Sequence, residues 1–232
     1  MGKFKHFTPP HLKNLAISNC GMTNLSPNFF KIGDKLLSMA KVDIEEKSRD
    51  QNFDSSFYCF PAIIMFCTSF EAYLNENLEV SKTLVNIKKC ENTDYISKTI
   101  ENIKNANEIK EKIKLFYKGY DQKGQGVDTN SSIYNNLISL FKLRNEIIHY
   151  SPEMTSIDKW PKRLQDVFFR SNPKIKINTD WTTTFGSVTV ANWARDTIKS
   201  AIQFFAEISG CRDPFSEKTP YPWHWEKEKF DE

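Results

Sequence analysis

Apolar residues recur at three- and four-residue spacing over most of this chain. That spacing places them on one face of a helix, and a helix with one apolar face packs against others. Four long segments carry the pattern: residues 27–48, a segment from Asp54 or Pro61 to about residue 80, residues 129–150 and residues 189–210. A weaker stripe of isoleucines predicts a further, more exposed helix at 94–117. The pattern therefore predicts a mainly all-α fold, an up-and-down bundle of four to five helices.

Capping residues indicate where several of these helices begin. Ser26 followed by Pro27 is typical of a helix start, because serine accepts a hydrogen bond from the first turn and proline is preorganised for it. One of the polar residues 129–131 can cap the fourth helix, and Thr189 the last. Pro61 either begins the regular part of the second helix or kinks a helix that begins earlier.

Two short stretches depart from the helical pattern. Residues 174–177 alternate between lysine and isoleucine, and residues 185–188, Phe-Gly-Ser-Val, are β-like. A small β-hairpin is therefore expected within residues 152–188.

The same pattern indicates how the chain is organised. One helical domain is expected at 27–210, between an irregular N-terminal arm at 1–26 and an aromatic C-terminal tail at 211–232. Within that domain, residues 81–128 read as a lysine-rich insertion and linker.

Composition narrows the class of protein. The 232 residues include 18 phenylalanines and carry a net charge of +3, which is typical of a globular chain. The longest strongly apolar run, residues 62–67, is far shorter than the roughly 20 residues of a transmembrane helix, and no secretory signal is recognisable. Five cysteines without a CxxC pair favour a reducing compartment. We expect a cytoplasmic protein with no membrane partner.

The sequence carries no motif for a bound metal or cofactor. The HExxH helix, the nucleophile elbow and the Gly-rich dinucleotide loop are absent, and residues 119–130 lack the order of a phosphate-binding P-loop. No histidine has companions at metal-ligand spacing. We expect no cofactor and no metal.

The strongest candidate chemistry lies at residues 144–149. At about 100° per residue, Arg144 falls in the middle of the apolar arc of its helix, where an ionised guanidinium is costly unless it meets an anion. Asn145 and His149, four apart, are neighbours on the flank of that arc. Arg144 and His149 are roughly 140° apart on an ideal helix. The side chains of Arg144 and His149 can reach one site only if the helix end distorts, or if a second copy of the helix contributes one of them.

Glu71 is the natural partner for Arg144. It lies at the edge of the apolar face of the second helix, where a carboxylate can orient a guanidinium and offset its desolvation. A Glu71–Arg144 contact is therefore predicted. The alternative is a boundary glutamate that reaches out to water.

Lys110, Lys112 and Lys114 belong to the lysine-rich segment. A solvated helix face explains such charges. The functional alternative is a basic rim that binds RNA beside a phosphate-cleaving site.

Arg144 and Asn145, followed after three residues by His149 at the end of an apolar helix, resemble the RNxxxH signature of the HEPN superfamily. The upstream run Ser69-Phe70-Glu71-Ala72 looks like the second helix of those domains. The resemblance covers residues 27–80 and 129–210.

The resemblance implies a homodimeric helical bundle that acts as a metal-independent endoribonuclease in toxin or phage-defence systems. Arg144 and His149 would be the catalytic pair, with Asn145 as the polar residue of the motif and Glu71 and Tyr150 supporting it. An antitoxin or activating partner would be consistent with it. Toxin members that pair with small nucleotidyltransferases have a tyrosine two positions after the histidine, whereas Tyr150 follows His149 directly.

The chemistry of RNA explains why a histidine and an arginine are sufficient to cleave it. The 2′-OH attacks the neighbouring phosphate, so the enzyme supplies proton transfer from a histidine and charge stabilisation from an arginine fork. The products are a 2′,3′-cyclic phosphate and a 5′-OH. Two alternatives remain open: a non-catalytic HEPN-like scaffold and a nucleotide-binding sensor module.

Overall fold

The computed structural model describes residues 25–47, 55–86, 93–121, 125–149, 162–171, 185–209 and Phe215. Within these ranges the chain forms helices and no strand, which confirms the all-α prediction. Seven helices lie in the described ranges, more than the four to five expected: α1 (Ser26–Lys47), α2 (Ser56–Asn86), α3 (Thr93–Asn105), α4 (Ile109–Tyr120), α5 (Ser132–Ile148), α6 (Lys162–Ser171) and α8 (Val188–Ser209).

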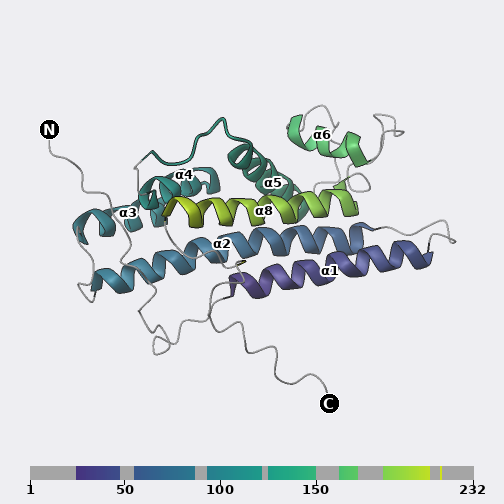
Figure 1. The fold of residues 1–232 in the computed structure, drawn as a ribbon, viewed down its shortest axis with the longest axis horizontal. Helices are drawn as coiled ribbons and strands as arrows, with labels where there is room; N and C mark the ends of the chain where they lie inside the picture. The colour runs from purple at the N-terminus through teal and green to yellow at the C-terminus, as the bar shows by residue number, and fades with distance from the viewer. Residues whose placement is uncertain are drawn as a thin grey trace, which may run out of the picture.

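Helices α2 and α8 form the centre of the molecule. The long helices α1 and α2 lie side by side, and α8 packs on both (Figure 1). Helices α4, α5 and α6 in turn pack on α8. Because it has neighbours on several sides, α8 buries residues along its length, from Val190 to Ser209.

The contact between α1 and α2 is close because α1 has a glycine where it meets a phenylalanine ring. A Cβ added to Gly33 would lie 2.6 Å from Cε1 of Phe66, which is fully buried. A larger side chain at this position would therefore require α1 or the Phe66 ring to shift.

Three predicted helix starts agree with the structure within a residue or two. Helix α1 begins at Ser26, immediately before Pro27. Helix α2 begins at Ser56, so Pro61 lies inside a helix that starts earlier. Ser131 caps α5, since its side chain accepts a hydrogen bond from the backbone N–H of Tyr134 at 3.2 Å.

The single helix predicted at 94–117 is wrong. The chain forms α3 and α4, separated at residues 106–108, where Glu108 has extended dihedral angles. The apolar stripe changes phase at this break: from Ile103 to Ile109 is six residues, about 240° round a helix. A break allows Ile103 and Ile113, both buried, to face the core together.

The lysine-rich segment is also more deeply packed than expected. Phe116 and Tyr117 of α4 are almost fully buried, and both rings contact Phe205 of α8. Helix α4 is therefore part of the main core.

The β-like reading of residues 185–188 is wrong as well. Val188 is the first residue of α8, and the Ser187 hydroxyl accepts a hydrogen bond from the backbone N–H of Val190 at 3.4 Å. The cap is thus Ser187 and not Thr189. Residues 162–171, inside the segment expected to hold a hairpin, form α6. The alternating residues 174–177 lie outside the described residues.

Helix α2 is longer and more apolar over its length than its short uninterrupted apolar run indicates. By length and composition alone, Ser56–Thr83 is apolar enough to cross a bilayer, although its longest uninterrupted apolar run is short. Half of its most apolar window is buried inside the fold, and the core helix of a helical bundle meets the same criterion.

Candidate functional site

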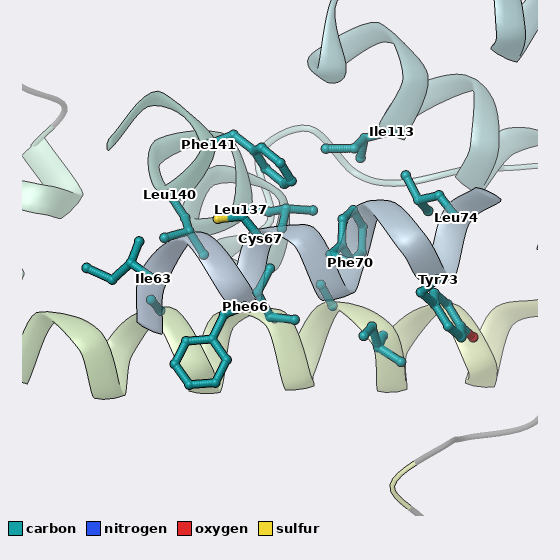
Figure 2. Close-up of a cluster of buried hydrophobic side chains, with 14 of the residues drawn as sticks. Ile63, Phe66, Cys67, Phe70, Tyr73, Leu74, Ile113, Leu137, Leu140 and Phe141 are labelled. Carbon is teal, nitrogen blue, oxygen red and sulfur yellow. The ribbon is translucent and has the colours of Figure 1, made fainter. Parts of the chain in front are cut away.

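The site is positioned by an apolar contact between α2 and α5. Figure 2 shows Leu137, Leu140 and Phe141 of α5 gathered over Cys67 and Phe70 of α2. The rings of Phe70 and Phe141 are 6.0 Å apart. One residue after Phe70 and three after Phe141, the two helices present Glu71 and Arg144 at the edge of this contact.

Glu71 and Arg144 form the predicted ion pair. Nη2 of Arg144 donates to Oε2 of Glu71 at 2.7 Å, and Nη1 donates to Oδ1 of Asn145 at 3.0 Å. The side chains of Arg144 and Glu71 are 21% and 33% exposed, so the pair lies at the boundary of the core. The predicted contact is confirmed: Glu71 pairs with Arg144 and does not reach out to water alone.

A buried thiol lies close to this pair. Burial raises the pKa of Cys67 far above its usual value, while the positive charge of Arg144 opposes the shift and the Glu71 carboxylate adds to it. Cys67 therefore stays protonated, and a protonated buried thiol is neither a nucleophile nor a metal ligand.

A solvent-open hollow of about 450 Å³ lies beside Arg144. Three helices contribute to it: α2 through Glu71, α5 through Arg144 and Asn145, and the start of α4. The residues from the start of α4 and the turn before it are Asn107, Glu108, Ile109, Lys110 and Lys112. The hollow therefore brings predicted catalytic and RNA-binding residues to one surface.

His149 lies outside this hollow. It is the C-terminal cap of α5, and its backbone N–H donates to the carbonyl of Asn145 at 2.9 Å. Its side chain is exposed and bonds to no other residue in the described part of the chain. Within one molecule, Arg144 and His149 thus face different surroundings, as the helix geometry predicts.

Other predicted residues separate in the same way. Lys114 lies over the ring of Tyr134, with its Nζ 5.9 Å from the ring centroid, and does not line the hollow. Ile148, an apolar residue four positions after Arg144, is 46% exposed. It is the last residue of α5. Tyr150 lies outside the described residues.

Asn107, Glu108 and Ile109 are site residues that the sequence pattern did not indicate. The pattern predicts a continuous helix through them, whereas they form the break before α4 and its first turn. The apolar stripe changes phase between Ile103 and Ile109, and this change is the sequence signal that could have revealed the break between the two helices.

The described residues contain no group of three or more His, Cys, Asp or Glu side chains arranged to hold a metal ion. Comparison with known proteins identifies no relative: no family model, no curated protein and no solved structure matches this chain.

Proposed function

We propose that this protein is a metal-independent endoribonuclease, the activity implied by its resemblance to HEPN domains. One arrangement supports the proposal: Arg144 is held by Glu71 and Asn145 at the wall of an open hollow, and the exposed His149 ends the same helix. A guanidinium fixed at a solvent-accessible surface is suited to bind a phosphate.

The reaction needs one proton acceptor, one proton donor and a positive charge. The RNA 2′-oxygen attacks the adjacent phosphorus, the bond from phosphorus to the 5′-oxygen breaks, and a 2′,3′-cyclic phosphate and a 5′-OH result. His149 takes the proton of the 2′-OH or gives one to the leaving 5′-oxygen, and solvent water takes the other role, so the proton lost from the 2′-OH is matched by one gained at the 5′-oxygen. Arg144 stabilises the negative charge on the phosphorane oxygens.

A second copy of the chain would bring both groups to one phosphate. Arg144 and His149 are roughly 140° apart on one helix, so the proposed site combines Arg144 of one protomer with the partner's His149.

The test is an RNA cleavage assay with excess EDTA, comparing the wild type with His149→Ala. We expect cleavage to fall at least about 100-fold in the variant, the usual size of a lost general acid or base, with helical content unchanged. Ser132→Ala is the control, since Ser132 is exposed at the opposite end of the same helix.

The product ends make the test specific. The wild type should leave 2′,3′-cyclic phosphate and 5′-OH ends and spare DNA, which lacks the 2′-OH. Equal cleavage by His149→Ala and the wild type, or cleavage that stops in EDTA, would contradict the proposal.

One observation favours the scaffold alternative. Nη1 and Nη2 of Arg144 are both hydrogen-bonded within the molecule, as expected of a structural ion pair. A folded dimer that cuts no RNA and gains no thermal stability from nucleotides would support the scaffold. A rise in melting temperature with a nucleotide, without cleavage, would support a sensor.

A further inference from the structure

We infer that the hollow beside Arg144 is a phosphate subsite, in which Lys110 and Lys112 hold the single-stranded RNA phosphate that neighbours the scissile one. The inference rests on the proposed ribonuclease function and adds to it where the RNA backbone lies. Both lysines would be positioning residues that set affinity, while Arg144 acts on the reacting phosphate.

The charges that line the hollow favour an anion. Lysine and arginine side chains contribute three positive charges, and Glu71 and Glu108 contribute two negative charges. Glu71 is already engaged with Arg144 at 2.7 Å. Lys110 and Lys112 form no ion pair with any residue that the structure describes. Their charges therefore remain available to an incoming phosphate, with Glu108 as the opposing charge.

The backbone at the start of α4 adds to this preference. Glu108 makes no side-chain capping bond to the first turn, while the N–H groups of Glu111 and Lys112 bond to its carbonyl at 3.0 Å. The positive end of the α4 dipole thus lies at the residues that line the hollow, and Glu111 is the acidic residue of its first turn.

The placement of the three lysines explains why two of them belong to the subsite. Lys110 and Lys112 are about 200° apart round the helix, and both reach one hollow because it lies at the end of α4. Lys114, a turn further along, is directed over the Tyr134 ring. The sequence alone does not show that Lys110 and Lys112 lie at the hollow and that Lys114 does not.

The hollow also has a suitable size. Its volume of about 450 Å³ lies within the range of roughly 300–1,000 Å³ found for small-ligand sites, which can hold one nucleotide unit. The subsite that we infer takes the phosphate next to the one at Arg144.

The experiment measures binding separately from cleavage. The probe is a fluorescent 12-nucleotide 2′-O-methyl RNA, which has no free 2′-OH and cannot be cut by transesterification. The full chain is compared with the double variant Lys110→Ala/Lys112→Ala and with Lys114→Ala, and cleavage kinetics are measured on unmodified RNA.

We expect the double variant to weaken binding on the order of tenfold at moderate salt. The slope of log affinity against log salt should fall by about 0.7, which corresponds to one phosphate of a single strand that is no longer neutralised. KM for cleavage should rise while kcat stays near the wild-type value. Lys114→Ala should bind as the wild type does, and Lys110→Arg/Lys112→Arg should restore affinity to within a few-fold. Glu108→Gln should change binding in the opposite direction, tightening it a few-fold.

The outcomes separate the subsite from the ribonuclease. If the wild type cleaves RNA but its affinity for the probe does not change when both lysines are replaced, the subsite is wrong and the ribonuclease proposal stands. The same holds if Lys114→Ala weakens binding as much as the double variant does. Binding that follows the predicted lysine pattern while no RNA is cut would overturn the ribonuclease and leave the subsite. A wild type that does not bind the probe at low salt would overturn the subsite.

Discussion

Arg144 has three guanidinium nitrogens in three different environments. Nη2 bonds to Glu71 and Nη1 to Asn145, while Nε is buried and has no hydrogen-bond partner among the described residues. The Phe141 ring lies close by, with its centroid 5.8 Å from Cζ. A partly buried cation in such a place depends strongly on its one charged partner.

Glu71→Ala should therefore lower the free energy of unfolding. We expect a loss of about 1–3 kcal/mol, since Arg144 would keep its charge without a partner. The value should fall in the lower part of this range because both side chains are partly exposed. Glu71→Gln, which keeps an oxygen acceptor, should cost less. Urea unfolding measures both.

Glu79→Ala is the matched control on the same helix. Glu79 pairs with Lys104 at 3.0 Å, but both side chains are more than 40% exposed, so we expect a change within about 0.5 kcal/mol. Equal losses for Glu71→Ala and Glu79→Ala would show that Arg144 does not need its carboxylate.

At the scale of single helices, the start of α1 is fixed by a residue from another helix. The backbone N–H groups of Leu25 and Ser26 donate to Oε1 of Glu76, on α2, at 2.7 and 2.9 Å. Burial raises the pKa of Glu76 above its usual 4.5, and these two backbone hydrogen bonds oppose the shift. The local Ser26–Pro27 signal thus predicts where α1 begins but not which acceptor caps it.

Replacement of Glu76 should separate its hydrogen bonds from its charge. Glu76→Ala removes the acceptor and should lower the free energy of unfolding by about 1–2 kcal/mol. Glu76→Gln keeps an oxygen for both N–H groups and should be at least as stable as the wild type near neutral pH.

The contribution of Glu76 to the free energy of unfolding should depend on pH. Because the pKa of Glu76 is raised on folding, its contribution to stability is fully present below pH 4.5 and is lost as the pH rises through the folded-state pKa. Glu76→Gln should remove this loss in urea unfolding measured from pH 4 to 8. A larger loss with rising pH in Glu76→Gln than in the wild type would contradict the assignment.

At the scale of the whole molecule, the lysine-rich segment belongs to the main core. The Phe116 ring lies 4.4 Å from that of Phe205, the Tyr117 ring stacks on Phe204 at 5.6 Å, and the Tyr117 hydroxyl donates to the carbonyl of Ala201 at 2.7 Å. These contacts join α4 to α8, so the hollow lies between helices that share one core.

Phe116→Ala should consequently destabilise the entire fold. We expect a loss of about 3–5 kcal/mol, typical of a buried phenylalanine, in one transition seen alike by circular dichroism and tryptophan fluorescence. Phe57→Ala is the control, since Phe57 is 73% exposed and should change stability by about 0.5 kcal/mol or less. An early, separate transition in Phe116→Ala would show that α3 and α4 unfold as an independent unit.

The sequence by itself determined the helical class, several helix ends and the Glu71–Arg144 pair. Helix periodicity and capping depend on residues within a few positions of each other, so they can be read locally. The ion pair follows from a similar constraint, because a cation on an apolar helix face requires a nearby anion.

Only the tertiary structure decided the rest. It places the break between α3 and α4, buries α4 against α8, and brings Lys110 and Lys112, but not Lys114, to the hollow that Arg144 also lines. A local pattern shows which face of a helix is buried but not which helix covers it. The hollow forms where three helices distant in sequence meet, and their packing determines which charged side chains share it.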